Sequence, residues 1–67
     1  MSEKIKFVGM RRIRNERKMS AEKLAELVGC SAQMIYLMER GEVNPSMELT
    51  NKIATDLGVK IDDLINY

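Results

Sequence analysis

Apolar residues recur at helical spacing in short segments along the chain, and glycine, proline and serine separate these segments. Three segments have a serine at the N-cap position and a glycine where a helix commonly ends. Residues 4–8 also alternate as a strand does, Gly9 weakens the start of the first helix, and Lys60 is a poor cap for the last. The pattern predicts an all-α fold with five helices, over about residues 7–17, 21–28, 32–40 and 47–57 and from about residue 61.

The second and third predicted helices are separated only by Gly29, Cys30 and Ser31. A connection this short forces two helices to cross rather than lie side by side, so a small residue is needed at the crossing point. Ala25 meets that need, and Gly29 tolerates the positive φ of a tight turn. The pattern therefore predicts a helix-turn-helix over about residues 21–40. Its buried apolar contacts are Leu24, Val28, Cys30, Ile35 and Met38, and other inward positions include Leu27 on the second helix and Met47, Leu49, Ile53, Ala54 and Leu57 on the fourth.

The length of 67 residues predicts a single domain over 1–67. Its core is small, so a domain of this size usually needs additional stabilisation by a disulfide, a metal ion or dimerisation. One cysteine and no histidine exclude an intrachain disulfide and a Cys/His metal site. The remaining source of stability is helix packing, assisted by dimerisation. The lack of a disulfide also predicts a reducing, cytoplasmic setting. We expect no metal, no cofactor, no signal peptide and no membrane span. An enzyme is not expected either, because no nucleophile and base stand at a recognisable spacing and no phosphate-cradling glycine motif occurs.

The charge is polarised along the chain although the formal net charge is only +1. Residues 1–20 hold seven basic and two acidic residues, a net of +5, and the remainder has a net of −4. A basic segment of this kind is either a solvated helix face or the electrostatic footprint of a nucleic-acid partner. The charge alone does not decide between the two.

The sequence resembles the Cro, lambda-repressor and Xre family of helix-turn-helix regulators over Met10 to Ile65. The resemblance is carried by Leu24-Ala25-Glu26, Gly29-Cys30-Ser31, Ile35 to Gly41, Asn44-Pro45-Ser46 and Ile53 to Val59. It implies a five-helix lambda-repressor-like domain whose third helix enters the major groove of DNA, commonly as a dimer on a palindromic operator. The implied function is a sequence-specific transcriptional regulator, and a repressor is the expected kind.

The resemblance also implies roles for particular residues. The positions that face base edges are Ala32, Gln33, Met34 and Leu37. Gln33 can pair bidentately with adenine, whereas the other three offer only van der Waals contact to thymine methyls, which predicts an A/T-leaning half-site. Ala21 stands where the family often has a glutamine that clamps a phosphate, so this clamp is missing. The helix N-terminus can still receive a phosphate.

Contacts to DNA phosphates are expected from residues on and around the helix-turn-helix, with a solvated face as the alternative for those in the first helix: Arg11, Arg17, Lys18, Ser31, Tyr36, Arg40 and Asn44. Arg12 belongs to the same basic segment. Arg14 and Glu39 match a family pair that joins the first helix to the end of the third, and we assign Arg14 to this structural role in preference to a DNA contact. Cys30 is expected to pack as a small hydrophobe rather than act as a redox thiol.

One short helix reads too few base pairs, so we expect a homodimer on double-stranded DNA. The expected interface is Val59, Ile61, Leu64, Ile65 and Tyr67. Two alternatives keep the fold. The chain could be the antitoxin of a toxin–antitoxin pair, or a protein-interaction adaptor whose apolar third helix binds protein instead of DNA. Salt dependence distinguishes the adaptor, because phosphate contacts weaken with salt and apolar contacts scarcely respond.

Overall fold

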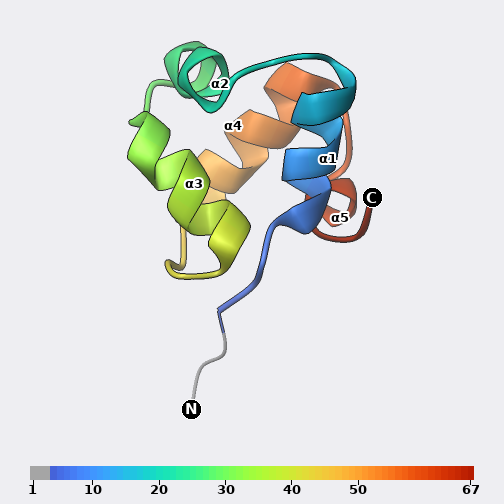
Figure 1. Ribbon diagram of the computed structural model, residues 1–67. Helices are drawn as coiled ribbons and strands as arrows, with labels where there is room; N and C mark the ends of the chain where they lie inside the picture. The colour runs from blue at the N-terminus through green and yellow to red at the C-terminus, as the bar shows by residue number, and fades with distance from the viewer. Residues whose placement is uncertain (1–3) are drawn as a thin grey trace.

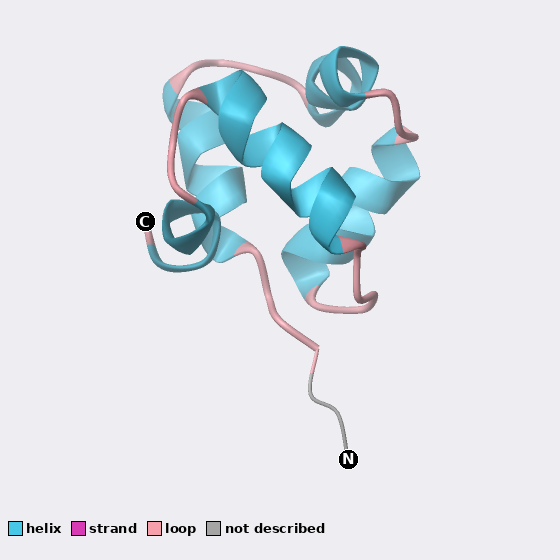
Figure 2. Ribbon diagram, turned by 180° about the vertical axis from the view of Figure 1, so that it is seen from behind, coloured by secondary structure: helices cyan, strands magenta, loops and turns pink. Residues whose placement is uncertain are grey.

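Five helices form the described part of the chain, residues 4–67, in the computed structural model (Figure 1). They are α1 (Val8–Glu16), α2 (Ala21–Val28), α3 (Ala32–Arg40), α4 (Met47–Leu57) and α5 (Ile61–Asn66). No strand occurs among these residues, as Figure 2 shows, so the predicted all-α fold is confirmed. The longest helix has 11 residues, too few to cross the hydrocarbon core of a membrane.

The helix boundaries follow from local capping. The Oγ atoms of Ser20, Ser31 and Ser46 accept hydrogen bonds from the backbone N–H groups three residues later, at 3.0, 3.1 and 3.1 Å. A glycine with positive φ ends each of the same three helices. These helices therefore begin and end where the serine and glycine pattern predicts.

The two predicted weak points of the chain are supported in other ways. At the entry to α1, the Phe7 N–H donates to the carbonyl of Met38 at 3.0 Å, so residues before α1 pair with the end of α3 rather than form a strand. At the start of α5, the Lys60 side chain forms no cap. The Lys60 backbone N–H instead donates to the Asp63 carboxylate at 3.2 Å.

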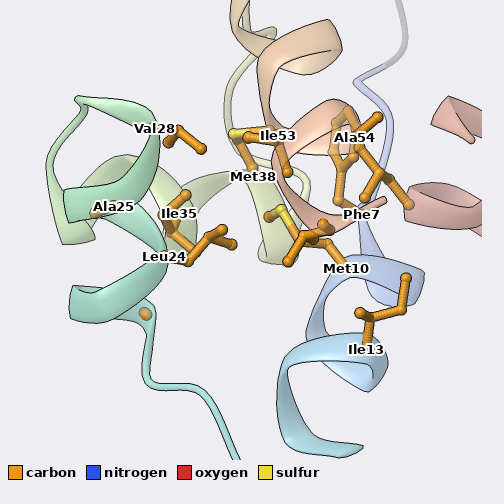
Figure 3. Packing of buried hydrophobic residues seen from close by; sticks show 13 residues of the cluster. Phe7, Met10, Ile13, Leu24, Ala25, Val28, Ile35, Met38, Ile53 and Ala54 are labelled. Atoms are coloured by element: carbon orange, nitrogen blue, oxygen red, sulfur yellow. The ribbon is translucent and has the colours of Figure 1, made fainter. Parts of the chain in front are cut away.

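The core lies where all five helices meet, and Figure 3 shows its side chains converging. Met10, Leu24, Ile35, Met38, Ile53 and Leu64 are fully buried. The predicted buried positions of the helix-turn-helix are confirmed, with one exception. Cys30 is only partly buried, because it lies in the turn at the edge of the core.

Two predicted inward positions are wrong. Leu27 is 44% exposed and Met47 is 66% exposed. Leu27 falls beside the inner face of α2, which Ala21, Leu24 and Val28 already fill, and Met47 is the first residue of α4, at the rim of the core. The polar Thr50 is buried on α4 instead, where its hydroxyl donates to the Ser46 carbonyl at 2.9 Å.

Helices α1 and α5 pack unusually closely, and Gly9 makes this possible. A Cβ atom on Gly9 would lie 2.0 Å from the carbonyl oxygen of Asp63 and 2.8 Å from the backbone nitrogen of Tyr67. Gly9 weakens the helix locally, but it allows α5 to lie against α1. The contact continues where Arg12 Nη1 donates to the Tyr67 carbonyl at 2.9 Å and the Tyr67 hydroxyl donates to Glu16.

This packing corrects one predicted interface residue. Leu64 is 0% exposed and is the buried residue of α5, with Ile61 and Ile65 packed partly against the core on either side of it. It therefore cannot contribute a free apolar side chain to a dimer. Val59, Ile61 and Ile65 are partly buried and keep some surface, and Tyr67 is 46% exposed.

Substituting Gly9→Ala should lower the free energy of unfolding by about 1–3 kcal/mol, because the new methyl group meets backbone that can only move away as a unit. Urea denaturation measures the effect. Asn51→Ala, at an exposed position inside α4, is the control and should be near neutral. Equal stability of the two variants would show that α1 and α5 do not pack as closely as described.

Candidate nucleic-acid interface

The crossing of α2 and α3 is held by the turn between them. The Ala25 carbonyl accepts hydrogen bonds from Gly29 at 2.8 Å and from Cys30 at 3.0 Å, which closes the end of α2. Ala25 is 3% exposed, and α2 packs against α3. Figure 3 shows Leu24, Ala25 and Val28 of α2 around Ile35 of α3. The inner sides of both helices are therefore committed to the core.

A buried ion pair fixes α3 to α1. Arg14 Nε donates to Glu39 Oε2 at 2.7 Å, Arg14 Nη2 donates to Glu39 Oε1 at 2.9 Å, and both residues are 7% exposed. Arg14 Nη1 also donates to the Met19 carbonyl at 2.9 Å, ahead of α2. The hydrogen bond to Glu39 raises the pKa of Arg14 and outweighs the opposing effect of burial. The ion pair that the sequence predicts is present, and it also ties down the entry to α2.

The outer face of α3 presents a short set of side chains to solvent. Gln33, Tyr36 and Arg40 are exposed, and Leu37 is half-buried without joining the core. Ala32 and Met34 pack partly against the core and offer less surface. Among the predicted base-facing residues, Gln33 and Leu37 are thus the most available.

An acidic side chain at the start of α2 was not anticipated. The Tyr36 hydroxyl lies 3.5 Å from Glu22 Oε2, within hydrogen-bond reach. Glu22 follows Ala21, which is 1% exposed and cannot clamp a phosphate. Its place after the Ser20 cap is typical of first-turn acids that favour the helix dipole, so local sequence gave no sign that it meets α3.

The predicted phosphate-contacting residues do not share one surface. Arg11, Tyr36 and Arg40 line a common groove between α1 and α3. Arg17 lies near Tyr67, where its charge opposes the rise in the pKa of the phenol that the hydrogen bond to Glu16 causes. Arg12 also contacts Tyr67, through the backbone carbonyl. The basic residues of α1 therefore divide between a side that faces α3 and a side that faces α5.

The remaining predicted phosphate contacts are exposed and carry local roles as well. Ser31 caps α3, and Arg40 Nε forms an ion pair with Glu42 at 2.8 Å. Asn44 lies in the loop after α3. Lys18 adopts φ +54 directly after α1, where a glycine would be free of strain.

Cys30 shows no sign of activation. Burial raises the pKa of its thiol, which lowers the thiolate fraction at neutral pH. Its thiol donates to the Ser31 carbonyl at 3.5 Å, and the side chain packs against the edge of the core. The structure therefore favours packing over redox chemistry.

Two short helices pack against each other, a three-residue turn joins them, and the outer face of the second helix is exposed beside basic side chains. This arrangement defines a helix-turn-helix domain.

Comparisons with known proteins agree with this class. The helix-turn-helix family profile matches residues 10–64. An uncharacterized HTH-type transcriptional regulator of Methanocaldococcus jannaschii is 43% identical over 49 residues, which are 73% of this chain and 74% of that protein. Another, from Archaeoglobus fulgidus, is 38% identical over 58 residues, 87% of this chain and 83% of that one. The solved restriction-modification controller protein C.AhdI from Aeromonas hydrophila is similar with a TM-score of 0.78 and 32% identity, over 85% of this chain and 86% of that chain.

The chain belongs to the helix-turn-helix family, among its short Xre-like regulators. Its sequence relatives carry the name HTH-type transcriptional regulator, and the family supports DNA-binding regulation as the function. The resemblance seen in the sequence is confirmed.

Glu39→Gln should destabilise the fold by about 3–5 kcal/mol, because it leaves the Arg14 charge buried without its partner. The double variant Arg14→Met with Glu39→Met should recover most of this loss, since replacing a whole buried pair by apolar residues is often neutral. Thermal unfolding of the single and double variants makes the comparison. A double variant as unstable as Glu39→Gln alone would show that something other than the unpaired charge causes the loss.

Proposed function

We propose that this protein is a sequence-specific transcriptional repressor that binds a palindromic operator as a homodimer, with α3 in the major groove. The observation that carries the proposal is the division of α3 into two faces. Its inner face is held by core packing and by the Glu39 ion pair, and its outer face presents Gln33, Tyr36 and Leu37. A helix fixed in this way can read base edges without first becoming ordered.

Within this proposal, Gln33 is the main specificity residue. It is exposed near the start of α3, where recognition helices contact bases, and its amide can both donate to and accept from adenine. Leu37 lies one turn further along α3 and offers an apolar surface to a thymine methyl. Ala32 and Met34 would add smaller apolar contacts. The proposed half-site is therefore rich in A·T pairs.

Phosphate contacts would come from both sides of α3. Arg11 and Arg40 lie beside α3 in the groove that Tyr36 also lines. Ser31 is exposed before α3, and Asn44 is exposed after it, where it also lines the apolar groove beside α5. Arg17 and Lys18 follow the end of α1, and Arg17 faces the Tyr67 side rather than α3.

The proposed dimer interface is an apolar groove beside α5. Ile61 and Ile65 line it together with Ile5 and Met47, which are 49% and 66% exposed. A second copy would cover these side chains and would place a second α3 on the adjacent half-site. Val59 and Tyr67 come just before and just after α5 and line no part of this groove, so they would contribute only at the edge of the contact. Repression then requires only that the bound dimer occupy a promoter.

An adaptor role rests on a specific observation, the exposed Tyr36 beside the half-buried Leu37 on α3. Such a surface also suits a protein partner, including the toxin of an antitoxin pair. The salt dependence of the binding affinity would distinguish these functions. DNA binding through phosphates should weaken steeply as salt rises, by about 0.9 logarithmic units per contact and per tenfold salt, and an apolar protein contact should hardly change.

Gln33→Ala should reduce the preference for the selected half-site, measured against a duplex in which one A·T pair is replaced. We expect a reduction of about 5- to 150-fold, which corresponds to one bidentate contact of about 1–3 kcal/mol. Competition binding on duplexes selected from a random pool measures the ratio. Asn51→Ala removes an exposed amide from α4 and should leave the ratio unchanged. Selected half-sites rich in G·C pairs, or a ratio unaffected by Gln33→Ala, would refute the proposed reading.

Met47→Glu should weaken the dimer at least tenfold, because it places a charge in the proposed apolar contact without disturbing the core. Sedimentation equilibrium measures the dissociation constant. Leu27→Glu is the matched control, since Leu27 is exposed on α2 and lines no part of this groove. The interface is misplaced if both variants dimerise as the parent does. Leu64→Asp is unsuitable as a test because it would disrupt the core.

A further inference from the structure

A groove with a basic rim runs between α1 and α3. Arg11 and Asn15 of α1 form one wall, and Tyr36 and Arg40 of α3 form the other. The Arg14–Glu39 ion pair forms the floor. The hollow measures about 320 Å³. Asn15 has no part in the core or in the helix-turn-helix, yet its side chain is exposed on the wall of this groove.

The groove continues toward the end of α3. A second hollow shares Arg11, Glu39 and Arg40 with the first and adds Lys6. Lys6 lies close to the end of α3, because a Cβ atom on Gly41 would be 3.3 Å from the Lys6 Cβ and the next residue, Phe7, donates its N–H to the Met38 carbonyl at 3.0 Å. Segments distant in sequence thus bring Lys6, Arg11 and Arg40 to one continuous surface beside α3.

The electrostatics of this surface favour an anion. The floor is close to neutral because Glu39 holds Arg14 through two hydrogen bonds, so the rim determines the charge. Among the described residues that line the two hollows, Glu42 is the only acid besides Glu39, and Glu22 reaches the rim through its 3.5 Å contact with the Tyr36 hydroxyl. Glu42 contacts Arg40 through Nε in a pair exposed to solvent, which a phosphate oxygen can replace at little cost.

We propose that this groove binds a phosphate group of the DNA backbone, with Lys6 and Asn15 as contact residues in addition to Arg11 and Arg40. The proposal rests on the proposed function, since the groove borders the outer face of α3 through Tyr36. Arg11 and Lys6 supply charge, and the Asn15 amide supplies a neutral donor.

The test compares salt dependence among matched variants. Fluorescence anisotropy gives the affinity for one duplex selected from a random pool, over roughly 50–300 mM KCl. The variants are Lys6→Gln, Arg11→Gln and Asn15→Ala, all at exposed positions. Lys52→Gln removes one positive charge from α4, outside this groove, and is the control. Thermal unfolding verifies that each variant is folded.

Arg11→Gln and Lys6→Gln should each reduce the salt slope by about 0.9, the value for one lost phosphate contact. Asn15→Ala should lower affinity severalfold at every salt concentration and leave the slope unchanged. If the parent chain binds DNA but Lys6→Gln and Arg11→Gln match Lys52→Gln, the groove proposal is overturned and the proposed function stands. If the parent chain binds no duplex in a salt-dependent way, both are overturned.

A second arm separates backbone phosphate from a free anion. Inorganic phosphate is titrated into labelled protein while NMR follows the Asn15 side-chain amide. The proposal expects no saturable shift below about 10 mM, because one isolated phosphate lacks the contacts of α3 that hold DNA in place. Saturation at micromolar phosphate would overturn the proposal in favour of a free-anion site.

Discussion

The buried ion pair between Arg14 and Glu39 is the interaction on which the rest of the structure depends. It joins α1 to the last turn of α3, and its remaining guanidinium nitrogen holds the Met19 carbonyl ahead of α2. Three segments of the helix-turn-helix region therefore meet at one side chain. Because a buried charge without a partner costs far more than the pair gains, this contact specifies one orientation of α3. The direction in which the outer face of α3 points is fixed by the same contact.

The fold was largely predictable because its signals are local. Helix α3 begins after Ser31, whose side chain caps it with a hydrogen bond, and ends at Gly41, which adopts a left-handed conformation. Both residues can be identified in the sequence. The placement of α5 was not predictable in the same way. Gly9 looked like a weakness in a helix, and only its distance to Asp63 shows that it allows α1 and α5 to touch. Leu64 was predicted to lie on the surface because the sequence of a short helix does not show which of its faces packs against the rest of the protein.

The candidate site was predictable residue by residue but not as a surface. The resemblance indicated Gln33 and Leu37 on α3, and both have surface that DNA could contact. The division of the α1 bases depends on which neighbour each one faces, and sequence order does not contain that information. Arg11 faces α3, whereas Arg12 contacts the carbonyl of Tyr67. The contact of Glu22 with Tyr36 likewise arises only when α2 crosses α3.

The central claim is that the outer face of α3 contacts DNA, and NMR titration tests it most directly. Labelled protein is mixed with a selected duplex, and the backbone amide shifts are compared along the chain. The account predicts the largest shifts for Gln33, Tyr36 and Leu37 and little change on the exposed face of α4 around Asn51 and Thr55. Largest shifts on that face of α4, with α3 unaffected, would contradict it.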